Sequence, residues 1–412
     1  MSDTKPFTEL LSAIVDNRGR TCPTSDDGIP LIATNCINND ALYPTYDKVR
    51  YVSPEIYDTW FRGHPEPGDL IFVTKGSPGR VCMAPDPIDF CIAQDMVAVR
   101  PDPHKVYPKY LFAALRSYQV QQAIGNMHVG TLIPHFKKGD FDKLNIPVPD
   151  SDVQGTIGDM YYSLSAKIEL NRRMNETLEA MARAIFKSWF VDFDPVRAKA
   201  SGEPPESICR RLGLTPDVLA LFPDSFQNSE LGEIPMGWEA GTLEDMLVLQ
   251  RGFDLPASER KPGQYPILAA SGPSGTHNEF MVRGPGVTTG RSGVLGKVFY
   301  VHQDYWPLNT SLWIKEFKRA KPAYAFHMLQ GLDFRSLNAG SAVPTLNRNH
   351  AHAMRLVVPS KDIIDSFESI AAMILANQQQ NLDQVVTLAD LRDNLLPKLL
   401  SGKLSPIPQG SH

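Results

Sequence analysis

The sequence predicts an α/β (α+β) protein built from two tandem copies of one unit, in which a mixed α/β domain precedes one long helix. Three observations lead to this prediction. The second half of the chain repeats motifs of the first at a nearly constant spacing, each half ends in a heptad pattern, and strand-like runs mix with helical ones before that pattern. A chain of 412 residues also exceeds what one hydrophobic core usually serves.

The repeat is clearest near the end of each half. Residues 130–134 (GTLIP) return 210 residues later as 340–344 (GSAVP), and the same spacing relates 146–149 (IPVP) to 356–359 (LVVP). Upstream the spacing grows. It is 217 residues where Gly76, Gly79 and Arg80 match Gly293, Gly296 and Lys297, and 233 residues where Arg18-Gly19 matches Arg251-Gly252. The front of each unit therefore varies while the back is kept, so we predict one scaffold, related by a pseudo-two-fold internal repeat, that carries two different heads.

Heptad periodicity predicts two long helices, over residues 151–194 and 360–404. Apolar or amide side chains recur there every 3.5 residues on average, which is the signature of a coiled coil. The first helix has the series Ile157, Leu164, Asn171, Leu178, Ile185 and Tyr161, Ile168, Asn175, Ala182, Trp189. The second has Phe367, Ile374, Asn381, Leu388, Leu395 and Ala371, Gln378, Val385, Arg392, Leu399.

We expect the two long helices to pair with each other, and to run antiparallel because the connection between the units is long. The alternative is that each helix packs only on its own domain. Asn171 and Asn381 fall at the same position of the pairing series, where a buried Asn would set the register. We expect Asp194-Pro195 to end the first helix and Pro397 to break the second.

These patterns divide the chain into a first domain (1–150), its long helix (151–194), a linker (195–230), a second domain (231–359), its long helix (360–404) and a tail (405–412). In the linker a short helical pattern runs from Leu214 to Leu221. Strands are expected at 69–73, 96–99, 298–301 and 311–314, and further helices at 110–124 and 322–332.

Composition and motifs exclude several classes of protein. A net charge of −5 argues against a uniformly basic DNA-coating protein, although a local basic face would still bind phosphate. No apolar run is long enough to cross a membrane, and we expect a cytoplasmic protein. The five cysteines are scattered, so we expect neither disulfides nor a zinc site.

We expect no catalytic residues and no metal ligands in this chain. There is no (D/N)PP(Y/F/W) motif of the kind that methyltransferases use and no G-x-S-x-G motif. Gly296-Lys297 lacks the following Ser or Thr and the earlier Gly of a nucleotide-binding loop. His350 and His352, and the Glu316-Phe317-Lys318 fragment, lack the partners that a metal site or a nuclease motif would need.

Glycine-rich turns with basic residues occur in both heads, at 75–80 (KGSPGR) and 291–297 (RSGVLGK). Such a turn either presents a cation and free backbone N–H groups to a phosphate, or forms an ordinary hairpin whose glycines take positive φ. We expect Lys75, Arg80, Arg291 and Lys297 to lie on a DNA-facing side. The full set of candidate DNA contacts, each of which could equally be a solvated surface residue, is Arg18, Arg20, Lys75, Arg80, Lys137, Lys138, Arg251, Arg283, Arg291, Lys297, Asn347 and Arg348.

Several strings in the repeated parts resemble the specificity subunit of Type I restriction-modification systems. They are 171–178 (NRRMNETL), 184–190 (AIFKSWF), 193–195 (FDP), 231–238 (LGEIPMGW) and 395–404 (LLPKLLSGKL). The resemblance covers nearly the whole chain. The first head departs from it, because Pro6-Phe7 stands where the second head begins with Pro235-x-Gly-Trp238.

The resemblance implies two target-recognition domains, each of which reads one half of a split, asymmetric site in double-stranded DNA. The paired helices, about 58 Å long at 1.5 Å per residue, would set the gap between the half-sites and dock two modification (methyltransferase) subunits. S-adenosylmethionine, ATP and Mg would then be bound by the modification subunits and by restriction subunits, and not by this chain. Two alternatives stay open: a self-contained methyltransferase or nuclease with fused recognition domains, and a coiled-coil scaffold unrelated to DNA.

Overall fold

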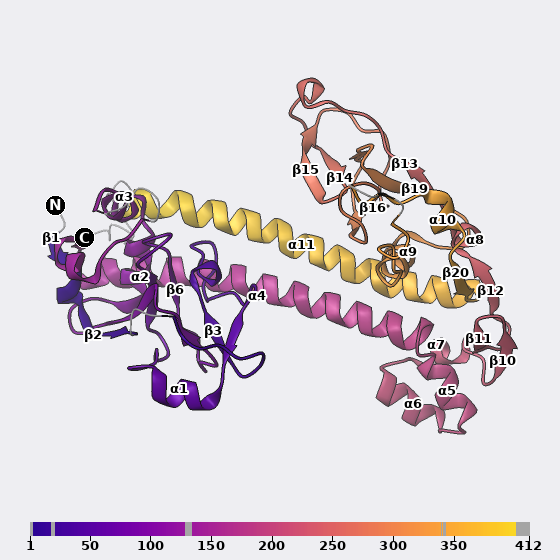
Figure 1. Ribbon diagram of the computed structural model, residues 1–412, viewed down its shortest axis with the longest axis horizontal. Coiled ribbons are helices and arrows are strands. Elements are labelled where there is room, and N and C mark those ends of the chain that lie inside the picture. The colour runs from indigo at the N-terminus through magenta and orange to yellow at the C-terminus, as the bar shows by residue number, and fades with distance from the viewer. Residues whose placement is uncertain (1–2, 18–20, 128–133, 339, 341–342, 401–412) are drawn as a thin grey trace, which may run out of the picture. The chain divides into compact units, whose positions relative to one another are not determined.

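The computed structural model describes residues 3–17, 21–127, 134–338, 340 and 343–400, and the chain divides into two compact units (Figure 1). Unit 1 comprises Met1–Arg173 and Asn381–His412, and unit 2 comprises Met174–Gln380. The two long helices, α4 (Ser151–Phe190) and α11 (Lys361–Leu400), therefore each contribute one half to each unit.

The strand-containing parts, head 1 (residues 3–148) and head 2 (residues 239–358), share one sheet topology. Head 1 has the strands β1 (Asp3–Pro6), β2 (Leu11–Asp16), β3 (Ile29–Ile32), β4 (Arg50–Val52), β5 (Leu70–Val73), β6 (Val81–Met83), β7 (Cys91–Ile92), β8 (Met96–Pro101) and β9 (Asn145–Val148). Head 2 has β12 (Glu239–Thr242), β13 (Leu247–Arg251), β14 (Tyr265–Ala269), β15 (Gly272–His277), β16 (Gly286–Gly290), β17 (Val298–Val301), β18 (Trp306–Pro307), β19 (Ser311–Phe317) and β20 (Arg355–Val358).

Each head contains three sheets that correspond one to one. The two-stranded β1-β9 sheet matches β12-β20, the four-stranded antiparallel β2-β8-β5-β6 sheet matches β13-β19-β16-β17, and the three-stranded β4-β3-β7 sheet matches β15-β14-β18. Even the single parallel pair recurs, between β3 and β7 in head 1 and between β14 and β18 in head 2. The predicted internal repeat of mixed α/β domains is therefore confirmed in three dimensions.

The short helices of the heads begin at prolines or polar caps. They are α1 (Pro54–Trp60), α2 (Pro108–Arg116) and α3 (Tyr118–Met127) in head 1, and α8 (Leu243–Met246), α9 (Pro322–Gln330) and α10 (Arg348–His352) in head 2. The single helix predicted over 110–124 is wrong, because the chain breaks it at Ser117. That residue is extended, and its hydroxyl accepts a hydrogen bond from the backbone N–H of Val120, which starts α3 as a separate helix.

The connection between α4 and head 2 is more structured than a linker. It contains α5 (Asp194–Ala200), α6 (Pro205–Leu212), α7 (Pro216–Ala220) and the hairpin of β10 (Phe226–Ser229) with β11 (Gly232–Pro235). Helix α4 ends at Phe190, and Phe193 turns the chain with a positive φ of 57°. Asp194 and Pro195 therefore begin α5, where a proline in the first turn costs nothing, instead of ending α4.

The prediction that Pro397 breaks the second long helix is wrong, since α11 continues through it to Leu400. A proline inside a helix removes one backbone hydrogen bond and costs roughly 3 kcal/mol. Leu396 and Leu399, on either side of it, are buried in the core of unit 1. The burial of these two leucines offsets that cost and keeps the last turn helical.

In unit 1 the first half of α4 pairs with the last half of α11. The Asn171 side-chain amide donates to the Gln384 side-chain oxygen (3.0 Å), and the Arg392 guanidinium lies 5.5 Å from the Tyr161 ring centroid. As the residue number falls along α4 it rises along α11, so the helices are antiparallel. This interhelical bond involves one of the two asparagines that the heptad pattern singled out.

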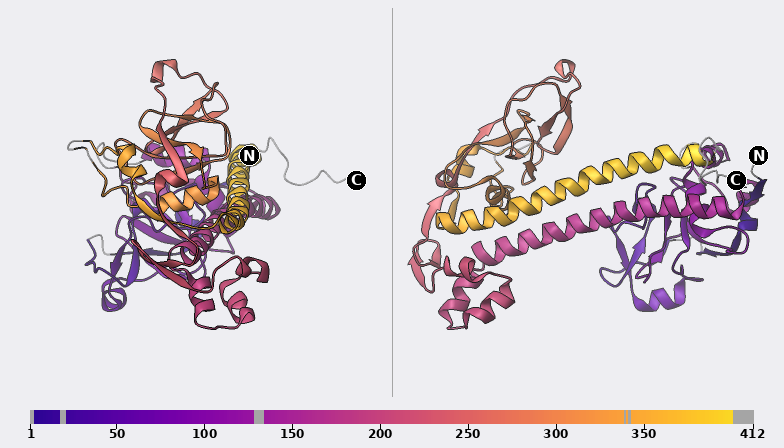
Figure 2. Two further views of the ribbon diagram at one scale, coloured as in Figure 1. Left: turned by 90° about the vertical axis from the view of Figure 1, so that its right-hand side faces the viewer. Right: turned by 180° about the vertical axis from the view of Figure 1, so that it is seen from behind.

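In unit 2 the second half of α4 pairs with the first half of α11, again antiparallel (Figure 2). The Asn175 side chain donates to the backbone carbonyl of Gln378 (3.0 Å), and the Gln378 side chain donates to that of Asn175 (2.9 Å). Further along, the Trp189 and Phe367 rings meet at 6.0 Å. The unit 2 core joins these two rings to Tyr324 of α9, so the head and the paired helices share one hydrophobic core.

Candidate nucleic-acid interface

The glycine-rich turn of head 1 is held by backbone hydrogen bonds from two distant segments. The Lys75 N–H donates to the Asp95 carbonyl (3.2 Å), the Gly76 N–H donates to the Pro134 carbonyl (2.9 Å), and the Phe136 N–H donates to the Thr74 carbonyl (2.8 Å). Gly76 has a φ of +87°. The turn is therefore clamped between the segment before β8 and the segment after α3.

The glycine-rich turn of head 2 is held in the same way. The Ser292 N–H donates to the Thr310 carbonyl (3.0 Å), the Gly293 N–H to the Pro344 carbonyl (2.9 Å), and the Leu346 N–H to the Arg291 carbonyl (2.8 Å). Because these N–H groups are occupied inside the protein, the turns are hairpin turns with positive-φ glycines and not cradles of free N–H groups. Any contact with a phosphate or a base must come from side chains around the turns.

A hollow of about 260 Å³ lies beside the head 1 turn, and we call it hollow 1. Two of its cations face carboxylates: Lys138 lies 2.7 Å from Asp16, and Lys75 lies 3.9 Å from Asp95. The two charges are therefore largely offset within the hollow. The residues that line hollow 1 are Asp16, Thr74, Lys75, Gln94, Asp95, Val97, His135 and Lys138.

A larger hollow of about 550 Å³ lies beside the head 2 turn, and we call it hollow 2. It brings together four of the twelve residues that the sequence marked as candidate DNA contacts. The residues that line hollow 2 are Arg251, Arg291, Leu312, Thr345, Leu346, Asn347 and Arg348. Its walls thus carry three arginines, whereas its floor includes the buried side chains of Leu312 and Leu346.

The two hollows occupy the same place in the repeat. Lys138 and Arg348 lie 210 residues apart, which is the spacing of the two long helices, and Thr74 and Arg291 lie 217 apart, which is the spacing of the glycine-rich turns. The strands β8 and β19, which occupy equivalent positions in their sheets, contribute Val97 and Leu312. One scaffold position therefore carries two different sets of side chains.

The other candidates lie outside these hollows. Arg80, Lys137 and Arg283 are exposed, and Arg18 and Arg20 lie outside the described residues.

Lys297 is not brought together with Arg291. It lines a separate cavity of about 770 Å³ together with α4 side chains, among them Arg183. We therefore leave Lys297 out of the candidate surface. Asn347 has a local role, because its side-chain oxygen caps α10 by accepting from the Asn349 N–H (3.0 Å).

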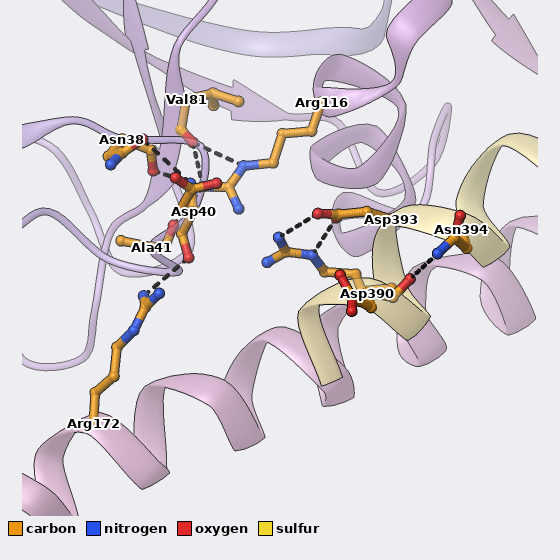
Figure 3. A network of polar contacts seen from close by, with 10 residues as sticks. Asn38, Asp40, Ala41, Val81, Arg116, Arg172, Asp390, Asp393 and Asn394 are labelled. Carbon is orange, nitrogen blue, oxygen red and sulfur yellow. Dashed lines mark hydrogen bonds and ion pairs between the residues drawn. The ribbon is translucent and has the colours of Figure 1, made fainter. Parts of the chain in front are cut away.

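A buried arginine in head 1 escaped the sequence reasoning. Arg116, at the end of α2, donates to the backbone carbonyls of Val81, Asn38 and Ala41, and its guanidinium lies 4.2 Å from the Phe112 ring centroid (Figure 3). The available signal in the sequence was its position directly after a run of apolar residues, Leu111 to Leu115. Arg116 ties the loop between β3 and β4, and the first residue of β6, to α2, and it is buried in head 1.

The same loop is also held by a long helix. Arg172 of α4 donates from its guanidinium to the backbone carbonyl of Asp40 (3.0 Å), and Figure 3 shows it reaching the loop from below. Nearby, Arg392 of α11 is buried and forms an ion pair with Asp393 at 2.8 Å. Arg172 is therefore a structural contact between head 1 and α4, whereas Arg392 pairs within α11 and packs on Tyr161 of α4.

Neither a metal site nor a membrane span is found in the part of the chain that the structure describes. Over these residues no three His, Cys, Asp or Glu side chains gather as metal ligands would, and no helix combines the length and apolar character needed to cross a bilayer. His352 is otherwise engaged, because its Nε2 accepts a hydrogen bond from the Leu249 N–H (2.9 Å).

Comparison with known proteins assigns both copies of the internal repeat to one domain family. The sequence profile of the Type I restriction modification DNA specificity domain matches twice, at residues 20–180 and 235–389. The chain belongs to this family. The first match covers head 1 from residue 20 onward, the second covers all of head 2, and each includes part of the long helix that follows. One specificity domain therefore corresponds to one copy of the internal repeat.

Two relatives support the assignment to the specificity-domain family. The chain is 26% identical to the Type I restriction enzyme HindI specificity subunit of Haemophilus influenzae, over 82% of this chain and 86% of that protein. It is 22% identical to the Type I restriction enzyme MjaIX specificity subunit of Methanocaldococcus jannaschii, over 82% of this chain and 78% of that protein.

A solved structure shares the fold of this specificity-domain chain. The S subunit of a Type I restriction-modification system from M. genitalium superposes with a TM-score of 0.62 at 16% sequence identity, over 97% of this chain and 96% of that one. Because so few residues are identical, the likeness concerns the fold and not the side chains of the hollows. The side chains of hollows 1 and 2 must therefore be interpreted from this chain itself.

Proposed function

We propose that this chain is the DNA sequence-specificity subunit of a Type I restriction-modification complex, and that it reads a bipartite, asymmetric site with one head per half-site. The observation that carries the proposal is that the two heads share their sheets and their clamped turns, yet line the equivalent hollow with different side chains. A split site with two unlike halves requires two such readers. A scaffold unrelated to DNA would need neither the hollow nor its cations.

The long helices are proposed to dock the modification subunits. Apolar side chains stand exposed on them within each unit, for example Met181 and Met373 in unit 2 and Leu382 and Val386 in unit 1. Exposed apolar side chains on a stable helix pair favour a protein partner over solvent. Restriction subunits would join the same complex, and the location that goes with this role is the cytoplasm.

The chain itself is proposed to be non-catalytic. S-adenosylmethionine would be bound by the modification subunits, and ATP and Mg by the restriction subunits, because this sequence contains no motif for any of these ligands. The competing proposal is a self-contained methyltransferase or nuclease with fused recognition domains. Methyl transfer from S-adenosylmethionine to DNA by the purified chain alone would decide in its favour.

The test is to co-express the chain with its modification subunits and to map methylated bases across the host genome. We expect one motif with two unlike half-sites separated by a gap of fixed length. A continuous or palindromic motif would contradict the proposal, as would equal binding of all duplexes at moderate salt by the purified complex.

A further inference from the structure

We propose that hollow 2 is the site at which head 2 reads a guanine, and that Arg348 and Arg291 are the side chains that read it. The inference rests on the proposed function and adds to it the residues and the base. Three observations lead to it: the ion pairing of the three arginines in hollow 2, the apolar floor of that hollow, and the contrast with hollow 1.

The three arginines of hollow 2 are not equivalent. Arg251 forms an ion pair with Asp254 at 3.4 Å, so its charge is offset. Arg291 donates from Nη1 to the Asn309 backbone carbonyl (3.1 Å), and Asn309 is itself held by its side-chain bond to Asp254. Arg348 is exposed at the start of α10. Over the described residues neither Arg291 nor Arg348 has an ion-pair partner, so two guanidinium charges in hollow 2 are not neutralised.

The anchoring of Arg291 prepares it for recognition. One nitrogen of its guanidinium is fixed by the Asn309 carbonyl, and its backbone is fixed on both sides by the bonds to Thr310 and Leu346. Among the residues that the structure describes, the guanidinium makes no further hydrogen bond, so its other donors are available. A side chain held in this way loses less conformational entropy when it binds, which favours a precise contact over a loose electrostatic one.

The donor pattern of hollow 2 favours a base over a phosphate. Phosphate contacts position a protein on the duplex and carry no sequence information, whereas a guanidinium fork held in a fixed place can read the edge of a base. Leu312 and Leu346 are almost completely buried and line the same hollow as the arginines, so its floor is apolar. The forked donors of a guanidinium match the O6 and N7 acceptors of guanine, which is the most common specific contact of arginine in the major groove.

Hollow 1 has the opposite chemistry at the same scaffold position. Its cations are the ammonium groups of Lys75 and Lys138, and each faces a carboxylate, from Asp95 and Asp16. Carboxylate oxygens accept hydrogen bonds and would repel the acceptor edge of guanine. The two heads therefore read different bases at corresponding positions of their half-sites, and a change in one hollow should leave the other half-site unaffected.

The experiment compares variants of the full complex with its modification subunits. Arg348→Ala and Arg348→Lys are each tested by methylome mapping and by binding to duplexes that carry the wild-type site or one substituted base pair. In both variants we expect the preference for one G·C pair over a substituted pair to fall by about 10- to 100-fold, in one half-site only. The Lys variant keeps the charge but loses the fork, so the salt dependence of its binding should change little.

Three controls keep the outcome interpretable. Arg335→Ala removes an exposed arginine of head 2 outside the hollow and should leave the motif unchanged. Lys138→Gln, in hollow 1, should relax the other half-site. Thermal unfolding of each complex confirms that the variant is folded.

Several results would overturn the inference. One is an unchanged motif in a folded Arg348→Ala complex. A second is relaxation at a pair without guanine, or in both half-sites. A third is a uniform loss of affinity for all duplexes with a shallower salt dependence, which would make Arg348 a phosphate contact. Failure of the wild-type complex to yield any bipartite motif would instead contradict the proposed function.

Discussion

Gly158 and Glu368 occupy the same position in the two repeats, 210 residues apart, and each determines how a helix of its head meets a long helix. In unit 2 the Glu368 carboxylate of α11 accepts hydrogen bonds from the backbone N–H groups of Ala323 (3.1 Å) and Tyr324 (2.8 Å), in the first turn of α9. In unit 1 a Cβ at Gly158 would lie 2.6 Å from the backbone nitrogen of Tyr110 in α2. The same junction is thus bridged by a side chain in one unit and closed by direct backbone contact in the other.

Gly158→Ala should therefore destabilise unit 1 even though alanine favours a helix. The new methyl group would meet backbone atoms of α2, which cannot move independently, at a cost of about 1–3 kcal/mol in the free energy of unfolding. Gly155→Ala is the matched control, since nothing lies within 4 Å of a Cβ there and the same helix should gain up to about 1 kcal/mol. Urea unfolding measures both, and equal effects of the two variants would refute the close-contact explanation.

Glu368→Ala should destabilise unit 2, because two N–H groups at the start of α9 lose their acceptors. The expected loss is about 1–2 kcal/mol in the free energy of unfolding. Glu368→Gln retains one acceptor oxygen but not the charge that favours a helix N-terminus, so its stability should fall between the wild type and the Ala variant. Urea unfolding measures both variants. If Glu368→Gln is as destabilising as Glu368→Ala, the carboxylate stabilises unit 2 through its charge and not through its hydrogen bonds.

Asn175 and Gln378 should each stabilise the pairing of α4 with α11 in unit 2, because each side chain donates to the backbone carbonyl of the other residue. Asn175→Ala and Gln378→Ala should each lower the free energy of unfolding by about 1 kcal/mol. Each backbone carbonyl remains when the other side chain is removed, so the double variant should lose about the sum of the two. Glu176→Ala, at an exposed neighbouring position, serves as the control in urea unfolding. Asn175 and Gln378 variants that are no less stable than the Glu176 variant would show that the reciprocal bonds are not formed in solution.

His327 should make unit 2 sensitive to acid. Burial, assisted by the Arg183 charge, lowers the pKa of His327 to about 4 and outweighs the opposing effect of the neighbouring Gln330 side chain. An unfolded histidine has a pKa of about 6.5, so between these values the unfolded chain binds the additional proton and stability falls as pH falls. Between pH 7.5 and pH 5 the expected loss is about 2 kcal/mol.

The variant His327→Leu isolates this effect, since leucine fills the site and does not titrate. We expect its stability relative to the wild type to increase as the pH is lowered from 7.5 to 5, measured by urea unfolding at both values. A wild-type minus variant difference that is independent of pH would show that His327 is not the titrating group.

Insertion of four residues in α4 between Asn171 and Leu178 should change the length of the gap in the methylated motif. Four helical residues add about 6 Å, close to the rise of two base pairs, and an insertion of this length approximately preserves the heptad seam. Both half-sites should stay the same. A control insertion of equal length in the β10-β11 turn should leave the gap unchanged, and an unchanged gap in the helix variant would refute the role of the helices as a spacer.

Local pattern was sufficient to predict the repeat, the two long helices and the head strands. A heptad series such as Ile157 to Ile185 depends only on near neighbours, as does a buried strand such as β5, and the 210-residue spacing is visible without any structure. The cations of both hollows were also among the predicted candidates. Their residue types and their recurrence in both units were the signal.

Contacts between distant segments decided the rest. Pro397 stays helical because Leu396 and Leu399 are buried in unit 1, and Lys297 faces α4 although it is only six residues from Arg291, because the hairpin between them reverses the chain. By itself the sequence determined that two similar scaffolds carry two different heads. Only the tertiary structure brought Arg291 and Arg348 into one hollow, because the direction of a side chain depends on what packs around it and not on its sequence neighbours.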